Sequence, residues 1–189
     1  MSQDLSCLLR DEVWVDESRA REFEAFVASH RERAVGLAWR LLGGDGAAAE
    51  DVAQEAFVRA HRALPGFRGD ARMSTWFHRI LVNEVRRHQR WRWVRLRRDT
   101  AMPAEVEDAG AAVPGDPSLR RRIAEALGRL SPGQREAFVL VHLEGFRVEE
   151  AAAITGRATG TLKSHLHRAL TGLRAQLRDL DPEPEASPR

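Results

Sequence analysis

Apolar residues recur at three- and four-residue steps along most of this chain, the spacing that places side chains on one face of an α-helix. The pattern is clearest between Asp51 and Arg90, where it predicts two amphipathic helices separated by a polar loop. Their apolar faces hold Ala53, Phe57, Ala60 and Leu64 in the first helix, and Phe77, Ile80, Leu81, Val85 and His88 in the second. The second helix is predicted to begin after a cap at Ser74 or Thr75. Alternating runs rich in Val, Ile and Tyr are missing, and tyrosine is absent altogether. The sequence therefore predicts an all-α fold.

Helices are also predicted on both sides of this stretch. A helical pattern follows Ser18 and stops at Gly43 and Gly44. Further along the chain, Ser131 and Gln134 form a capping box around Pro132, which predicts a helix over Pro132–Leu143.

Residues 99–117 are mainly Ala, Asp, Glu, Gly and Pro, a composition that cannot build a core. The 189 residues are enough for two small domains. We therefore expect two small helical domains joined by a flexible linker. The predicted parts are a flexible N-terminal tail at 1–17, a first domain at 18–93, the linker at 94–117, a second domain at 118–180 and a C-terminal tail at 181–189.

Composition narrows the possible functions. The formal net charge is +2, and of the 30 basic residues only Lys163 is a lysine. A single cysteine, Cys7, allows no internal disulfide and supplies no zinc site. No apolar run is long enough to span a bilayer, and acidic residues stand where a secretory leader would be basic and then apolar, so we expect a cytoplasmic protein without direct membrane insertion. No catalytic constellation or phosphate-cradling loop is visible, so we expect neither an enzyme nor a cofactor.

Two polar faces of the central helices are candidate binding surfaces. Asp51, Gln54 and Glu55 share one side of the first helix near its N-terminus, either as a solvated face or as a docking surface for a basic partner. On the second helix one stripe combines an indole, an amide and guanidinium groups, in Trp76, Arg79, Asn83, Arg86 and Arg90. These groups can stack on bases and neutralise phosphates. The alternative is an indole at the core boundary beside ordinary surface arginines.

The C-terminal stretch is typical of a helix-turn-helix, with a short helix, a turn at Gly156, Arg157 and Ala158, and a longer helix. If Leu162, Leu166, Leu170, Leu173 and Leu177 are buried, polar residues remain exposed near the start of the longer helix, where a major-groove reader needs them. An ordinary helical hairpin with a polar exterior is the alternative. Trp91 and Trp93 either extend the DNA-binding stripe or pack on the first domain.

The stretches DVAQEAFVRA and FRGDARMSTWFHRILVNEVRR resemble the second conserved region of extracytoplasmic-function (ECF) sigma factors, and GTLKSHLHRAL resembles the fourth. The resemblance runs from about Phe23 to Leu177. It implies that Asp51, Gln54 and Glu55 bind the β′ coiled coil of core RNA polymerase, with the β flap as a further polymerase partner. It also implies a non-enzymatic role in promoter-specific transcription initiation, under a probable anti-sigma factor.

The resemblance further assigns two sets of promoter-DNA contacts. Residues implied to capture the melted minus-ten element are Phe67, Arg68, Asp70, Arg72, Met73, Ser74, Thr75, Trp76, Arg79, Asn83, Arg86 and Arg90. Those implied to read the minus-thirty-five duplex are Thr159, Gly160, Thr161, Lys163, Ser164, His167 and Arg168.

This chain departs from the family pattern in the first helix of the helix-turn-helix. Arg147 replaces a Ser or Thr cap, Ala151 and Thr155 replace larger aliphatic residues, and Arg157 replaces a small apolar one. We expect a slightly looser helix as a result. The alternative function, of a different class, is a stand-alone helix-turn-helix regulator whose first domain senses a ligand or dimerises.

Overall fold

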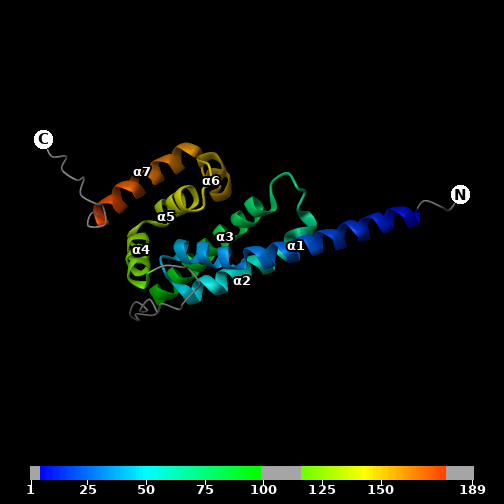
Figure 1. The fold of residues 1–189 in the computed structure, drawn as a ribbon, viewed down its shortest axis with the longest axis horizontal. Coiled ribbons are helices and arrows are strands. Elements are labelled where there is room, and N and C mark those ends of the chain that lie inside the picture. The colour runs from blue at the N-terminus through cyan, green and yellow to red at the C-terminus, as the bar shows by residue number, and fades with distance from the viewer. Residues whose placement is uncertain (1–4, 99–115, 178–189) are drawn as a thin grey trace.

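The computed structural model describes residues 5–98 and 116–177, and within these ranges all regular structure is helical. Figure 1 shows the helices in order along the chain. They are α1 (Leu5–Leu42), α2 (Gly46–Ala63), a short 3₁₀ turn at Leu64–Gly66, α3 (Met73–Arg98), α4 (Pro117–Arg129), α5 (Pro132–Phe138) with a π-helical continuation at Val139–Leu143, α6 (Val148–Thr155) and α7 (Thr159–Gln176). The predicted all-α class is confirmed.

Helix α1 is longer than the sequence pattern indicated. It begins at Leu5, well before the predicted start after Ser18, and its N-terminal part projects beyond the other helices in Figure 1. No proline interrupts the chain between Leu5 and Leu42, so nothing forces the helix to start later. The predicted stop is confirmed, because Gly43 and Gly44 both have positive φ.

Helices α1, α2 and α3 form an N-terminal module around one aromatic side chain. Phe77 of α3 is 2% exposed, and its ring centroid lies 4.4 Å from that of Phe57 and 5.4 Å from that of Phe26. Helix α2 is capped by Asp45, whose Oδ1 accepts a hydrogen bond from the Ala48 N–H at 3.1 Å. The periodic apolar positions therefore face inward, as the sequence predicts.

Helices α4 to α7 form a C-terminal module with Leu127, Leu140, Ile154 and Leu162 fully buried. The Ser131 N–H donates to Gln134 Oε1 at 3.1 Å, so the predicted cap of α5 is present. At the start of α6, the Arg147 N–H donates to Glu150 Oε2 at 2.8 Å, the same kind of bond as at Ser131. The Arg147 side chain has no acceptor, so it cannot supply the other bond of a capping box.

The two modules pack against each other, a contact that the sequence did not predict. Helices α4 to α7 lie along one side of the α1–α3 bundle in Figure 1, with α6 against α3 and α4 against α1. Their buried apolar residues form one continuous cluster. The predicted linker core, residues 99–115, lies outside the described residues, so its flexibility stays a prediction.

Gly44 allows the α1–α2 turn to approach α4 closely. Its φ is +101°, and a Cβ at this position would lie 2.7 Å from the Cβ of Ala124. We expect Gly44→Ala to lower the free energy of unfolding by about 2 kcal/mol or more, through backbone strain and overpacking. Urea denaturation measures the change. Gly145→Ala is the matched control, because its φ is +76° but nothing lies within 4 Å of the added atom. Equal losses in both variants would argue against close packing at Gly44.

Candidate polymerase- and DNA-binding surfaces

The acidic face of α2 is presented to solvent because the opposite face is buried. Val52, Ala53 and Ala56 are at most 4% exposed, which fixes the rotation of the helix. Asp51 and Gln54 are exposed and Glu55 is half-buried, so the structure brings all three together on one surface.

Ion pairs connect this acidic face to α3. The Arg59 guanidinium lies 3.0 Å from Glu55 and 2.9 Å from Glu84. Burial raises the pKa of the Glu84 carboxyl, and the charge of Arg59 opposes that rise. A groove of about 400 Å³ between α2 and α3 is lined by residues that include Asp51 and Trp91. Within the acidic face, Glu55 is therefore linked to Glu84 of α3 through Arg59.

The loop before α3 is attached to the helix through an aromatic contact. The rings of Phe67 and Trp76 lie 4.8 Å apart between centroids. Between them the loop is solvent-exposed, including the sequence-predicted residues Arg68, Asp70 and Arg72. Helix α3 begins at Met73, and the Trp76 N–H donates to the Arg72 carbonyl at 3.1 Å. The predicted cap at Ser74 or Thr75 is therefore wrong, because this bond extends the helix past both residues.

The predicted stripe of α3 is only partly open to solvent. Arg79, Asn83 and Arg90 are exposed, and Trp76 is half-buried. Arg86 instead forms two parallel bonds to Glu136 of α5, with Nε–Oε1 and Nη2–Oε2 both 2.7 Å. Its Nη1 donates to the Thr155 carbonyl at 2.9 Å. The hydrogen bond to Glu136 raises the pKa of Arg86.

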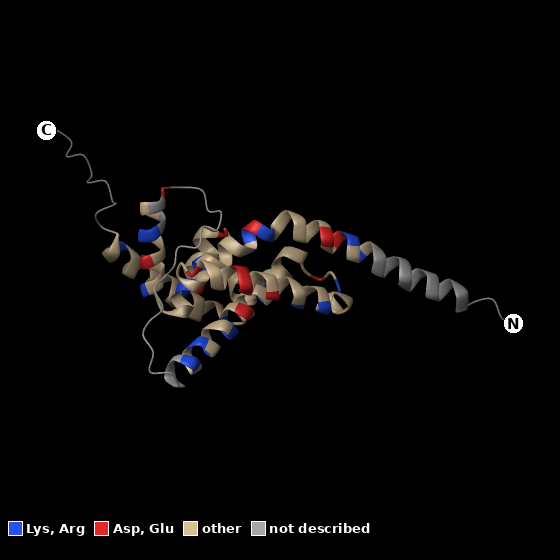
Figure 2. Cartoon of the chain, turned by 90° about the horizontal axis from the view of Figure 1, so that it is seen from below, with Lys and Arg blue, Asp and Glu red and all other residues tan. Residues whose placement is uncertain are grey.

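Helix α3 continues past this stripe and exposes two more indoles. Trp91 is 58% exposed and Trp93 is 55% exposed, so neither is part of the core. The Arg95 guanidinium carbon lies 5.2 Å from the Trp91 ring centroid, within cation–π range. In Figure 2 basic residues alternate with uncharged ones in the part of α3 that precedes its grey end. This end of the helix therefore combines aromatic and cationic surface.

The helix-turn-helix geometry is present in α6 and α7. Gly156 ends α6 with a φ of +64°, and α7 begins at Thr159. Of the five leucines predicted to be buried, Leu162 and Leu173 are buried, and Leu166, Leu170 and Leu177 are half-buried, so the prediction is met in full only at the first two. The reason is position: α7 lies at the outer edge of the module and packs mainly on α5.

The predicted groove-reading side of α7 is polar. The exposed predicted contact residues are Gly160, Thr161, Lys163, Ser164, His167 and Arg168, and Thr159 is half-buried. Ser164 Oγ donates to the Gly160 carbonyl at 3.0 Å, so this hydroxyl is partly engaged within the helix. The remaining donors and positive charges face solvent at the N-terminal half of α7, where a duplex could approach.

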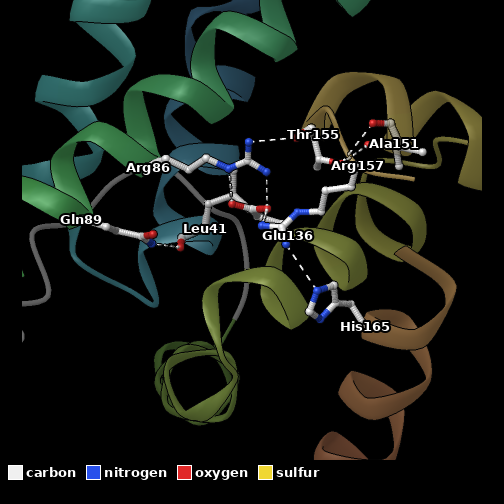
Figure 3. A network of polar contacts seen from close by, with 9 residues as sticks. Leu41, Arg86, Gln89, Glu136, Ala151, Thr155, Arg157 and His165 are labelled. Carbon is white, nitrogen blue, oxygen red and sulfur yellow. Dashed lines mark hydrogen bonds and ion pairs between the residues drawn. The ribbon is translucent and has the colours of Figure 1, made fainter. Parts of the chain in front are cut away.

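A charged network between the modules was missed by sequence reasoning. It joins Arg86 of α3 to Glu136 of α5, and Glu136 Oε2 also accepts from Arg157 Nη2 at 3.0 Å (Figure 3). Glu144 pairs with Arg33 at 3.1 Å and with Arg40 at a shorter distance. The position of a charged residue within a helical pattern does not indicate its partner far away in the sequence. The available signal was Arg157, which stands where the family pattern has a small apolar residue.

His78 lies buried at the boundary between the modules. Its side chain is 6% exposed, its Nδ1 bonds to the Ser74 carbonyl, and its ring meets that of Phe146 edge-on at 5.0 Å. Burial lowers the pKa of His78 below the ordinary value of 6.5, helped by the charges of Arg33 and His30 and opposed by the Ser74 carbonyl and Glu144. The folded protein therefore keeps this imidazole neutral at pH values where an exposed histidine is charged.

The shift of His78 predicts a pH-dependent stability. Above the unfolded pKa of 6.5 both states are neutral and the full stability is present. As the pH falls below 6.5, the unfolded chain gains a proton at His78 that the folded protein does not take up, so stability decreases until the lowered folded pKa is reached. Urea denaturation across this range should show a weaker decrease in His78→Gln than in the exposed control His167→Gln. Identical slopes in the two variants would contradict the assignment.

In the described part of the chain, no three potential ligand side chains converge as a metal site. None of the described helices has the length and hydropathy needed to cross a membrane.

Comparison with known proteins identifies the class. Residues 26–95 match the family described as Sigma-70 region 2, and residues 120–173 match Sigma-70, region 4. The chain therefore carries both conserved regions of a sigma factor of the sigma-70 class, region 2 before region 4.

Individual relatives are more specific. The chain is 36% identical over 165 residues to RNA polymerase sigma factor CarQ of Myxococcus xanthus, covering 85% of this chain and 92% of the relative. It is 32% identical over 176 residues to the ECF RNA polymerase sigma-E factor of Escherichia coli K12, covering 85% and 91%. The chain belongs to the ECF sigma factors.

Two solved structures share the fold. The sigma factor RpoE of Bartonella quintana, in complex with the anti-sigma factor NepR, matches with a TM-score of 0.74 and 29% identity, over 84% of this chain and 98% of that one. CnrH, in complex with the cytosolic domain of CnrY, matches with a TM-score of 0.62 and 31% identity, over 86% and 90%.

Proposed function

We propose that this chain is a cytoplasmic promoter-specificity subunit of bacterial RNA polymerase that directs transcription initiation. The observation that carries the proposal is the presence, in one chain and in order, of both sigma regions, at residues 26–95 and 120–173. Binding alone accounts for this role, so no bond is broken by the protein itself.

Polymerase docking is assigned to Asp51, Gln54 and Glu55. These side chains form an acidic surface, which suits a basic helical partner such as the β′ coiled coil. The β flap is the proposed partner of the C-terminal module. The acidic face is on the surface of α2, so access to it requires no rearrangement of the fold.

Capture of the melted minus-ten element is assigned to the loop Phe67–Met73 and to the exposed side of α3. The indole of Trp76 and the guanidinium of Arg79 offer stacking and phosphate contacts that suit unpaired bases. Binding of extruded bases would offset the free-energy cost of unstacking them. Ser74, Thr75, Asn83, Arg86 and Arg90 complete this proposed contact surface.

Reading of the minus-thirty-five duplex is assigned to the start of α7. Thr161, Lys163 and Arg168 supply donors and charge to a major groove. The two promoter elements lie some twenty base pairs apart, and with about 3.4 Å of helix axis per pair one small domain cannot reach both. Two modules on one chain meet this requirement.

Control by an anti-sigma factor is part of the proposal. One solved structure that shares this fold, RpoE of Bartonella quintana, is a sigma factor in complex with an anti-sigma factor. The binding surfaces on α2, α3 and α7 are separate, so an inhibitor would need to contact more than one of them.

Run-off transcription with purified core polymerase tests the proposal. A start-site-specific product that depends on this chain is expected, with promoters identified by mapping starts after overexpression. The alternative, a stand-alone helix-turn-helix regulator, predicts specific duplex binding without polymerase. A gel-shift on the mapped promoters with and without core enzyme separates the two: specific binding by the chain alone, with no transcript, would overturn the proposal.

A further inference from the structure

A single carboxylate holds positively charged groups from both modules. Glu136 is 3% exposed and accepts two parallel bonds of 2.7 Å from Arg86 of the N-terminal module. Its Oε2 also accepts from Arg157, which lies in the turn of the helix-turn-helix, at 3.0 Å. Figure 3 shows Arg86 and Arg157 converging on this one side chain. The carboxylate therefore neutralises Arg86, a candidate DNA contact of the N-terminal module, and Arg157 of the C-terminal module.

The geometry at Arg86 is that with which a guanidinium binds phosphate. Two parallel N–H donors meet two oxygens of one anion, an arrangement that carboxylates and phosphates share. The third donor position is also occupied, because Nη1 bonds to the Thr155 carbonyl at 2.9 Å. A DNA phosphate therefore cannot form the same two parallel bonds to Arg86 until Glu136 has moved away.

Further polar contacts hold the same closed arrangement. Glu144 of the C-terminal module, 2% exposed at its side chain, pairs with Arg33 and Arg40 of α1. Arg135 donates to the Leu41 carbonyl at the end of α1 at 3.0 Å. Removing one partner of a buried ion pair leaves the other charge buried without compensation, which has a large free-energy cost. These contacts therefore favour one packing of the two modules.

We propose that Glu136 is an intramolecular competitor for DNA: by binding Arg86 in place of a phosphate, it latches the two modules in a closed state with low affinity for the minus-ten strand. The inference rests on the proposed function and concerns the regulation of the same site. Closure leaves Asp51 and Gln54 exposed, so core polymerase can bind the closed chain. Opening then exchanges the Glu136 contact for promoter phosphate.

The latch makes opening and DNA binding thermodynamically linked. A strand that binds only the open state has an apparent affinity reduced by the fraction of chains that are open. Weakening the latch must therefore raise DNA affinity without adding a DNA contact. The same change should leave polymerase affinity unaltered, because the acidic face of α2 is exposed in the closed state.

Glu136→Gln is the test variant, since it keeps the side-chain shape and removes the charge. Glu125→Gln is the matched control, removing a carboxylate from the exposed face of α4 in the same module. Dyes at Arg62→Cys and Arg174→Cys, in a Cys7→Ser background, report the separation of the modules by energy transfer. Fluorescence anisotropy with a random-sequence single strand of about 16 nucleotides reports strand binding. A third titration measures binding to core polymerase.

The expected result is a longer dye separation and an increase in single-strand affinity of at least about fivefold for Glu136→Gln over Glu125→Gln. Polymerase affinity should be equal in both. Unchanged dye separation and strand affinity, with normal polymerase binding, would overturn the latch and leave the proposed function intact. Failure of every variant to bind polymerase would overturn the proposed function. In that case the dye separation would still show whether Glu136 holds the two modules together. If Glu136→Gln does not fold, Glu144→Gln must open the modules by breaking the second set of pairs.

Discussion

The Asp51→Arg variant should lose at least about thirtyfold of its affinity for core RNA polymerase, because a central interface residue of reversed charge both removes a contact and adds repulsion. Asp51 is exposed on the acidic face of α2, and the neighbouring Val52 and Ala53 are buried. The substituted side chain therefore points to solvent and leaves the core intact. Titration of labelled core polymerase measures the loss, and run-off transcription should fall with it.

Glu24→Arg is the matched control for that experiment. Glu24 is an exposed acidic residue on α1 that is not part of the acidic face of α2, and its replacement makes the same change in net charge. It should bind polymerase within about twofold of the unmodified protein if the effect at Asp51 is local. Equal losses in both variants would point to long-range charge effects, and no loss in Asp51→Arg would remove α2 from the docking surface.

The helices could be predicted because their signals are local. The capping box at Ser131 and Gln134, the glycines after α1 and the turn at Gly156 each involve residues a few positions apart, and the structure forms all three. The exposed location of Asp51 follows equally from the helical period once the apolar face is known. Family resemblance then added the partner, which spacing alone left as an unspecified basic surface.

The packing of the modules could not be predicted, because it depends on charges far apart in sequence. Arg86 has the spacing of a stripe residue, and nothing near it in the chain indicates that its partner is Glu136. Arg157 stood out as a departure from the family pattern, but its role follows only from the geometry. The start of α3 was placed too late for a different reason: Ser74 and Thr75 are good caps, yet a backbone bond one turn earlier extends the helix.

These contacts also change how the α3 stripe should be interpreted. Its residues were grouped by spacing, which treats them as equally available. The structure separates them into exposed Arg79, Asn83 and Arg90 and the occupied Arg86. Mutating Arg86 would remove a proposed DNA contact and the latch together, with opposite effects on strand binding. Glu136 is therefore the informative position, since it belongs to the latch alone.

The Arg135→Met variant should lose about 3 kcal/mol or more of unfolding free energy, because Arg135 is a buried cation that satisfies carbonyl groups at two helix ends. Arg135 is 8% exposed. Its guanidinium donates to the backbone carbonyls of Leu127, Gly128 and Leu130 at 2.7–3.1 Å. It also donates to the Leu41 carbonyl. Burial lowers the pKa of Arg135, so its charge has a desolvation cost that the helix C-terminal dipoles help to offset.

Methionine fills a similar space without donors, so the carbonyls at the ends of α4 and α1 would be left without these partners. Arg135→Lys should lie between the two, since an ammonium keeps the charge but cannot reproduce the planar fork. Arg129→Met, at an exposed position in the last turn of α4, is the matched control and should change stability by less than about 0.5 kcal/mol. Urea denaturation measures all three. A loss below about 1 kcal/mol in Arg135→Met would mean that water replaces the guanidinium at both helix ends, and that this arginine does not hold α4 to α1.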